Sequence, residues 1–264
     1  MNELRATPLR EFVSKTIVSV DPETPLQTVQ SLLVERDISS VPVVSANGNL
    51  EGILSTTDLL RDAAARVAHL AEPPRPEARL ARDLMRTDVV TVPLDADLFH
   101  AAREMIAHHI HRVVVVEQDK PVGILSTRDM MRAVFFHHVM TPLSRVMTTP
   151  VESIDHGDSI RAAMARLERA NVHGLVVTDG NWPVGVFTHT EALHARALPT
   201  EFLDTPVERV MSYESVSLEG DTPLYRVAGT AIQTRVRRIL VLKGRELQGI
   251  ASGFDLVRVI VMDE

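Results

Sequence analysis

Hydrophobic positions along the chain change between helical and strand spacing. Apolar residues recur every three or four positions within 26–33 and again within 98–106, which is typical of one buried helix face. Short β-branched runs follow these segments. A polar turn then leads to a second run that contains a glycine, which predicts a hairpin. The expected first strands of the hairpins are 41–44, 113–116, 175–177 and 239–242.

The same pattern occurs four times in register. An apolar anchor is followed 13 positions later by an apolar residue and 38 or 39 positions later by a glycine. A hydroxyl stands three positions, and an acid six positions, beyond each glycine. Agreement at five features indicates an internal repeat. In chain order the anchors are Val13, Met85, Met147 and Met211; the glycines are Gly52, Gly123, Gly185 and Gly249; the hydroxyls are Ser55, Ser126, Thr188 and Ser252; and the acids are Asp58, Asp129, Glu191 and Asp255.

Each repeat is expected to fold as a β-α-β-β-α unit of roughly 50 residues. Thr24-Pro25 and Thr222-Pro223 predict helix starts, because a threonine oxygen can cap an orphan N–H and proline is accepted at the first helical position. A second helix is expected at the hydroxyl and acid, for example over 57–68. The opening strands are expected at 16–20, 89–92, 151–154 and 215–218.

One such unit is too small to bury both helices and both faces of a three-stranded sheet, so the repeats are expected to pair. The predicted class is α/β (α+β), with four units in two pairs. The predicted division is 1–66 for the first repeat, 67–82 for a proline-rich linker, 83–138 for the second repeat, 139–198 for the third and 199–264 for the fourth.

Composition narrows the class of protein. Hydrophobic residues make up 45% and aromatic residues 4%, which predicts a globular protein with an aliphatic core. The net charge of −7 disfavours nucleic-acid binding as the main role. The chain has no cysteine, which excludes disulfides and thiol chemistry. It shows no secretory signal and no run long enough for a membrane span, so we expect a soluble, cytoplasmic protein.

The glycine motif that follows a Val-Pro-Val-Val strand resembles the cystathionine-β-synthase (CBS) domain. The matching segments are Gly52 to Asp58 after Val41 to Val44, Gly123 to Asp129, and Gly249 to Asp255. The resemblance covers about residues 12–262. It implies that two copies pair into a Bateman module and that two modules can form a disc. Four copies in one chain are similar in layout to the γ regulatory subunit of the AMP-activated kinase.

The resemblance implies that adenine nucleotides or S-adenosyl compounds bind in clefts between paired copies. It assigns the ribose contact to Asp58, Asp129 and Asp255, with Ser55, Ser126, Thr188 and Ser252 as the neighbouring hydroxyls. A carboxylate at a helix N-terminus suits this contact, because it can accept hydrogen bonds from both ribose hydroxyls. The glycine would let the backbone approach the ligand closely. The same hydroxyl-x-x-acid pattern is also an ordinary helix cap, so both interpretations stay open.

Basic residues before the middle strand are the candidates for phosphate contact. His111-Arg112 and Arg237-Arg238 hold the place of a His-Arg pair that contacts phosphate in the kinase subunit, and guanidinium donors suit phosphate geometry. The alternative for His111-Arg112 is a solvated start of a strand. Family geometry combines Ser55 and Asp58 with Val89, Val90, His111 and Arg112; Ser126 and Asp129 with Thr16 and Ile17; and Ser252 and Asp255 with Pro150 and Val151.

The third repeat departs from this pattern. Glu191 is one methylene longer than the family's aspartate, which makes ribose contact there doubtful. Gly174 stands where a basic residue could sit. The pocket of Thr188 and Glu191 is therefore predicted to be empty or altered.

The favoured function is a regulatory sensor rather than an enzyme. It would bind AMP, ADP, ATP (with or without magnesium) or an S-adenosyl compound and pass the ligand state to a separate effector protein, as a single chain or a homodimer. The alternative is a ligand-free scaffold, with Phe135, Phe136, Met140, Phe202 and Leu203 seating a partner or packing within the chain. Five clustered histidines are candidate metal ligands, but exposure to solvent is the favoured interpretation: His108, His109, His111, His137 and His138.

Overall fold

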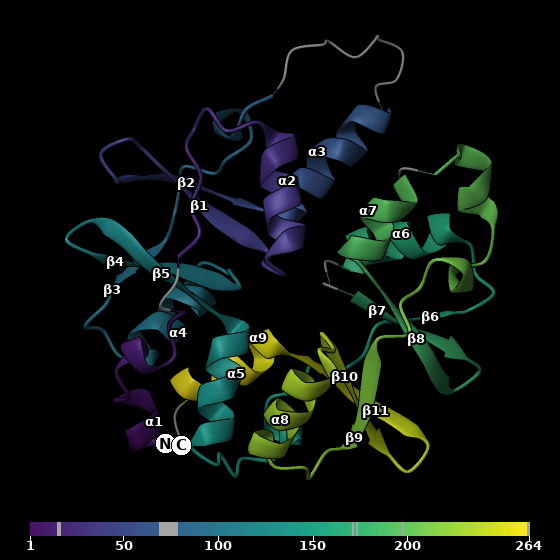
Figure 1. Ribbon diagram of the computed structural model, residues 1–264. Helices are drawn as coiled ribbons and strands as arrows, with labels where there is room; N and C mark the ends of the chain where they lie inside the picture. The colour runs from purple at the N-terminus through teal and green to yellow at the C-terminus, as the bar shows by residue number, and fades with distance from the viewer. Residues whose placement is uncertain (15–16, 69–78, 171, 173, 197, 263–264) are drawn as a thin grey trace. The chain divides into compact units, whose positions relative to one another are not determined.

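The computed structural model describes residues 1–14, 17–68, 79–170, 172, 174–196 and 198–262. These residues form two compact units, whose helices and strands are labelled in Figure 1. The smaller unit comprises residues 8–96 and 112–125. The larger unit comprises residues 1–7, 97–111 and 126–264. Residues 69–78, most of the predicted proline-rich linker, lie outside the described residues.

The smaller unit contains the sheets of the first two repeats. The two-stranded sheet is an antiparallel hairpin, and in the three-stranded sheet the opening strand runs parallel to the middle strand. A cluster around Val29, Leu33 and Leu54 forms its aliphatic core. Its elements are η1 (Leu9–Glu11), α2 (Leu26–Glu35), β1 (Ser40–Val44), β2 (Leu50–Ser55), α3 (Thr56–Ala68), η2 (Ala81–Asp83), β3 (Thr91–Pro93), β4 (Arg112–Glu117) and β5 (Lys120–Ser126).

The larger unit holds the helices of the second repeat together with the whole third and fourth repeats. Its two sheets have the orders β6-β7-β8 and β11-β10-β9, each with a parallel opening strand and an antiparallel hairpin. Its elements are α1 (Asn2–Arg5), α4 (Leu98–Ala107), α5 (Thr127–Phe136), η3 (Leu143–Arg145), β6 (Ser153–Asp155), α6 (Ile160–Ala170), β7 (Gly174–Asp179), β8 (Trp182–Thr188), α7 (His189–Arg196), η4 (Thr200–Asp204), η5 (Val207–Arg209), β9 (Ser215–Glu219), α8 (Leu224–Thr234), β10 (Arg238–Lys243), β11 (Glu246–Ser252) and α9 (Gly253–Val261).

The predicted architecture of four small sheet-and-helix units is confirmed, but the opening strand of the first repeat was wrong. Of the expected strand 16–20, Thr16 lies outside the described residues, and only Val20 pairs, through an isolated parallel bridge to Val43. Val20 donates to the Pro42 carbonyl at 3.0 Å and accepts from Val44 at 2.9 Å. Because Pro42 has no N–H, the next rung of a parallel ladder toward residue 18 cannot form.

The first helices of the first and fourth repeats begin one residue later than predicted. Pro25 and Pro223 are the N-caps rather than the first helical residues, and neither helix has a side-chain cap. Thr24 Oγ1 instead accepts from the Asp21 N–H. In all four repeats the first helical N–H donates to a backbone carbonyl in the segment that leads into the paired repeat, which satisfies an orphan donor. These bonds are Leu26 to Arg79, Leu98 to Thr7, Ile160 to Thr205 and Leu224 to Thr141, at 2.8 to 3.0 Å.

The repeated glycine makes room for the paired repeat. A Cβ atom on Gly52 would lie 2.8 Å from Met85 Sδ, and one on Gly123 would lie 2.3 Å from Val13. Gly185 and Gly249 meet the other two anchors in the same way, Met211 at 2.8 Å and Met147 at 2.5 Å. The space that this glycine leaves is therefore filled by the anchor of the paired repeat, and its approach to a ligand stays a prediction. The apolar anchor of one repeat thus packs on the glycine of the repeat that is paired with it.

Helices of the second repeat pack against helices of the fourth within the larger unit. Helix α5 lies beside α8 and α9, and α4 lies beside α9 (Figure 1). A Cβ atom on Gly229 of α8 would be 3.0 Å from the Phe135 ring, so Phe135 packs within the chain although its side chain is 47% exposed. Phe202 and Leu203 also pack within the chain, against the core of the third repeat. Phe136 and Met140 are 66% and 69% exposed.

Among the helices of the described residues, none has the length and apolar character needed to cross a bilayer.

Candidate functional site

The second helix of every repeat begins with the same local structure. In the fourth repeat the Ser252 N–H donates to Asp255 Oδ2 at 2.8 Å, and the Ser252 hydroxyl donates to the same oxygen at 2.7 Å. Asp58 and Asp129 accept equivalent pairs of hydrogen bonds from Ser55 and Ser126. The hydroxyl-x-x-acid motif is therefore a capping box, as the structural alternative predicted.

The cap uses only one oxygen of each carboxylate. Asp255 Oδ1 lies 3.6 Å from an Arg258 nitrogen and accepts from the Thr148 hydroxyl at 3.5 Å. Asp129 Oδ1 lies 3.6 Å from Arg132. A carboxylate has about four lone-pair sites, so capping and ligand contact are compatible in one side chain.

Sequence reasoning missed the arginine that stands three positions after the aspartate. Arg132 and Arg258 belong to Asp-x-x-Arg motifs, and Arg61 has the same spacing from Asp58. One turn of helix brings such residues together. The repeat itself contains this regularity: three copies have an arginine three positions after the acid, and the third copy has His194 in that place.

Glu191 reaches the same cap as the aspartates. Thr188 donates to Glu191 Oε2 from its backbone N–H at 2.8 Å and from its hydroxyl at 2.5 Å. The additional methylene therefore leaves a carboxylate oxygen at the same distance from the helix start as in the fourth repeat. All four acids are half-buried.

Part of one predicted set of site residues comes from segments of the third and fourth repeats that meet. Thr148 pairs with Ile250 of β11 through an antiparallel bridge, with hydrogen bonds of 2.8 and 3.1 Å. Because the bridge is antiparallel, Pro150 and Val151 follow it toward the start of β11, away from Ser252, and their grouping with Ser252 and Asp255 stays a prediction. Val151 packs against the same buried cluster as Ile250. The hydroxyl of Thr148 itself reaches Asp255.

Arg238 lies where the third and fourth repeats meet. It opens β10, opposite Ser252 on one side and Ser215 on the other. A Cβ atom on Gly174, which opens β7 of the third repeat, would lie 3.7 Å from Arg238 Nε. Burial lowers the pKa of the Arg238 guanidinium, whereas Asp255 and Glu191 act in the opposite direction. Arg237 is exposed.

The other predicted sets are divided between the two compact units. Ser55, Asp58, Val89, Val90 and Arg112 belong to the smaller unit, and His111 to the larger. The imidazole of His111 lies 5.4 Å from the Phe254 ring of α9 in an edge-on contact.

The predicted binding site that contains Ser126 and Asp129 is also divided between the two units. Ser126 and Asp129 belong to the larger unit and Ile17 to the smaller, while Thr16 lies outside the described residues. The grouping of these residues with one another stays a prediction.

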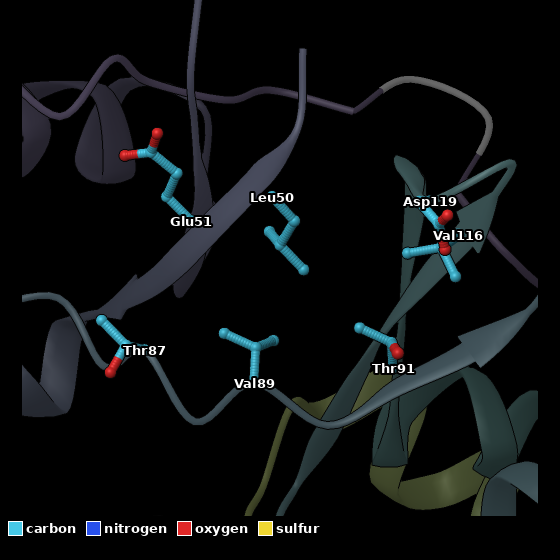
Figure 2. A pocket seen from close by; sticks show the side chains of 7 residues that line it. All are labelled: Leu50, Glu51, Thr87, Val89, Thr91, Val116 and Asp119. Atoms are coloured by element: carbon cyan, nitrogen blue, oxygen red, sulfur yellow. The ribbon is translucent and has the colours of Figure 1, made fainter. Parts of the chain in front are cut away.

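A hollow of about 250 Å³ lies in the smaller unit beside the start of β2. Figure 2 shows the Leu50 and Val89 side chains facing each other across it, and Glu51 and Asp119 are among its lining residues. Val89 is the only predicted site residue that lines it among the residues described, whereas Ser55 stands at the other end of β2. This hollow is therefore not the predicted ribose cleft.

The clustered histidines make local contacts. His137 Nε2 lies 3.0 Å from Thr7 Oγ1, and His138 lies against Tyr225 with ring centroids 5.2 Å apart. His108 lies 3.5 Å from Glu104 one helical turn away. Within the described part of the chain, no three His, Cys, Asp or Glu side chains are grouped as metal ligands would be.

Comparisons with known proteins agree with the repeat structure. The family described as the CBS domain matches residues 9–65, 81–135, 143–198 and 207–262. The uncharacterised protein MJ1404 of Methanocaldococcus jannaschii is 26% identical over 273 residues, which cover 96% of this chain and 62% of that protein. The chain thus spans about three fifths of the length of this relative.

Solved structures share the fold. MJ1225 of Methanocaldococcus jannaschii, a proposed archaeal homologue of γ-AMPK, has a TM-score of 0.76 at 17% identity, with 96% of this chain and 99% of that chain covered. CBSX2, solved in complex with AMP, is 27% identical and covers 50% of this chain and 98% of its own, with a TM-score of 0.42.

Proposed function

Because the chain belongs to the CBS-domain family, we propose that it is a regulatory protein that binds an adenosine-containing ligand in clefts between paired repeats. The observation that carries this proposal is the group formed by Asp255, Thr148 and Arg238. It combines a carboxylate with one oxygen outside its helix cap, a hydroxyl from the paired repeat and a half-buried guanidinium.

Each part of an adenosine nucleotide has a matching group in this cleft. Asp255 and Ser252 would contact the ribose hydroxyls, since a charge-assisted hydrogen bond to a carboxylate is stronger than a neutral one. Arg238 and Arg237 would contact phosphate, for which a guanidinium fork is well suited. Pro150 and Val151, which follow the bridge to β11, would lie against the base.

The other clefts are proposed by the same correspondence. Ser55 and Asp58 would act with Val89, Val90, His111 and Arg112, and Ser126 and Asp129 with Thr16 and Ile17. Magnesium would enter only with a polyphosphate ligand, whose charge it would neutralise. The cleft of Glu191 is proposed to be empty or altered.

We propose that the output is passed to a separate effector protein, without catalysis by this chain. A ligand that spans two repeats shifts their relative arrangement only to the extent that it binds one arrangement better than another. The distances between Asp255, Thr148 and Arg238, contributed by two repeats, are the ones such a ligand would change.

A ligand-free scaffold is the second candidate, and exposed aromatic and sulfur side chains favour it. Phe136, the last residue of α5, and Met140, which follows the helix, are 66% and 69% exposed. Exposed apolar side chains that lie close together are typical of protein-binding surfaces.

Thermal unfolding in the presence of ligands distinguishes the two candidates. Protein shown to be free of nucleotide is heated with AMP, ADP, ATP, S-adenosylmethionine, cyclic di-AMP or GTP, with and without magnesium. A ligand at 100 times its Kd adds about 2.7 kcal/mol to the free energy of unfolding, which raises the melting temperature clearly. A shift with adenosine ligands and none with GTP supports the sensor. No shift with any of them contradicts it and favours the scaffold.

A further inference from the structure

The first turns of α5 and α9 lie against each other within the larger unit. Gly253 is the first residue of α9 and Thr127 the first residue of α5, and each follows the hydroxyl residue of a capping box. A Cβ atom on Gly253 would lie 3.4 Å from Thr127 Oγ1, which is an ordinary contact distance. The helix starts that carry Asp129 and Asp255 are therefore neighbours.

Phe254 extends this contact to the residues that precede β4 in the second repeat. Its ring centroid lies 5.4 Å from that of His111, at an interplanar angle of 64°, and 6.2 Å from that of His109, at 23°. Aromatic rings attract each other at centroid distances of about 4.5–7 Å. Phe254 is half-buried, whereas both histidines are exposed. The ring next to Asp255 is thus packed on another repeat.

His111 is in turn bonded to the start of α5. Its backbone carbonyl accepts from the Thr127 N–H at 2.9 Å. Phe254 and Asp255 share the first turn of α9, and Thr127 and Asp129 share the first turn of α5. Contacts therefore run without a break from one aspartate to the other. Packed and hydrogen-bonded groups of this kind can carry energetic coupling between two sites.

The second repeat makes a corresponding contact in the opposite direction. Arg128 holds the place of Phe254 in its own motif and donates to the Ile232 carbonyl of α8 at 3.3 Å. Threonines hold this place in the first and third repeats, at Thr57 and Thr190. The long side chains thus occur in the two repeats whose helices pack together in the larger unit.

We propose that Phe254 is a positioning residue that couples the proposed clefts of Asp129 and Asp255, so that a ligand in one cleft changes the affinity of the other. Phe254 and Asp255 belong to one helix start, so a ligand that shifts the carboxylate also shifts the ring against His111. By thermodynamic linkage the effect is equal in both directions. The inference rests on the proposed function and adds a regulatory property to it.

Binding of labelled AMP, and separately of ATP, to the full chain measures this coupling. Asp58→Asn is present throughout, so that the clefts of Asp129 and Asp255 remain, and each of these is also measured alone in an Asp255→Asn or Asp129→Asn protein. Equilibrium dialysis of the two-cleft and one-cleft proteins gives the factor by which occupancy of one cleft changes the Kd of the other. We expect a change of about fivefold or more with Phe254 and no change with Phe254→Leu.

Matched variants separate the ring contact from stability. Phe254→Tyr keeps an aromatic ring and should retain the coupling. Tyr213→Leu removes a ring that is 71% exposed elsewhere in the fourth repeat and should also retain it. His111→Leu removes the other side of the contact and should reduce the coupling, which provides a test if melting curves show that Phe254→Leu does not fold. A purely structural role for Phe254 would lower the melting temperature without changing the coupling.

Two outcomes overturn the inference while leaving the proposed function intact. One is independent binding by the two clefts when Phe254 is present. The other is undiminished coupling in a folded Phe254→Leu or His111→Leu protein. Absence of AMP and ATP binding to the wild type would instead contradict the proposed function itself.

Discussion

Met147 Sδ lies 2.5 Å from the position that a Cβ atom on Gly249 would occupy. The two residues are the anchor of the third repeat and the glycine of the fourth, and they meet beside the bridge from Thr148 to Ile250. The glycine is thus a packing requirement of the pair, and its substitution has a measurable cost.

Gly249→Ala should lower the free energy of unfolding by about 1–3 kcal/mol, the usual cost of overpacking a core. Urea unfolding measures the change. Gly220→Ala is the matched control, because its Cβ atom would lie at an ordinary 3.4 Å from Ser144. The cost of Gly249→Ala should fall in a Met147→Ala background, as expected for residues in direct contact. Equal costs in both backgrounds would show that Met147 is not the obstacle.

Asp255→Asn and Asp255→Ala should separate the two roles of this carboxylate. Asparagine retains one oxygen that can accept from Ser252, so the cap should survive, while the second acceptor toward the ligand is lost. Alanine also removes the cap and should cost about 1 kcal/mol of stability. Melting temperatures with and without an adenosine ligand measure both effects. Undiminished ligand stabilisation in Asp255→Asn would rule out the ribose role.

His156 should make the stability of the third and fourth repeats depend on pH. Its Nδ1 lies 3.0 Å from Glu208 Oε2, and this hydrogen bond raises the pKa of His156 above its ordinary value of 6.5. Asp155 and Asp179 act in the same direction. A group with a raised folded-state pKa stabilises the fold fully below its unfolded-state pKa and loses this contribution as the pH rises through the folded-state value.

Glu208→Gln tests this dependence. The melting temperature of the variant should fall below that of the wild type at pH 5.5, and the difference should shrink by pH 8.5. Because His156 is in a solvated contact, the effect should also weaken in high salt. The same difference at both pH values would mean that the imidazolium is not responsible.

Phe135 and Phe136 offer a comparison of adjacent aromatic residues. Phe135 packs on Gly229 of α8, so Phe135→Ala should cost about 1–2 kcal/mol, in proportion to the apolar area that is buried. Phe136→Ala should change stability by less than about 0.5 kcal/mol, because the side chain is 66% exposed. Urea unfolding of both variants measures this contrast. A large loss in Phe136→Ala would show that this side chain supports the fold.

The repeat and its hairpins could be predicted because they depend on local patterns. Alternation of apolar runs, polar turns and hydroxyl-x-x-acid motifs acts over a few residues, and four copies reinforce one another. The capping role of Asp255 could be named from the sequence for the same reason, as the alternative to ligand contact. The failed opening strand of the first repeat was also within reach, since Pro42 removes the donor that the strand needs.

What the sequence could not reveal were contacts between residues far apart along the chain. The anchor and the glycine were recognised as separate regularities, although Met147 and Gly249 touch in space. The position of Arg238 beside Gly174 depends in the same way on how the two repeats meet. The helix starts were misjudged because their donors are satisfied by another repeat rather than by their own threonines.

The exchanged hydrogen bonds at the helix starts make each repeat dependent on its neighbour. Leu224 donates to Thr141 and Leu143 donates to Thr222, so each partner completes a helix or turn of the other. A lone repeat would leave these donors to water, together with an apolar anchor and a glycine groove that have lost their counterparts. A chain with an odd number of such repeats would therefore need a second chain to supply the partner of the unpaired copy. An unpaired repeat would expose an apolar surface that favours association with a second chain.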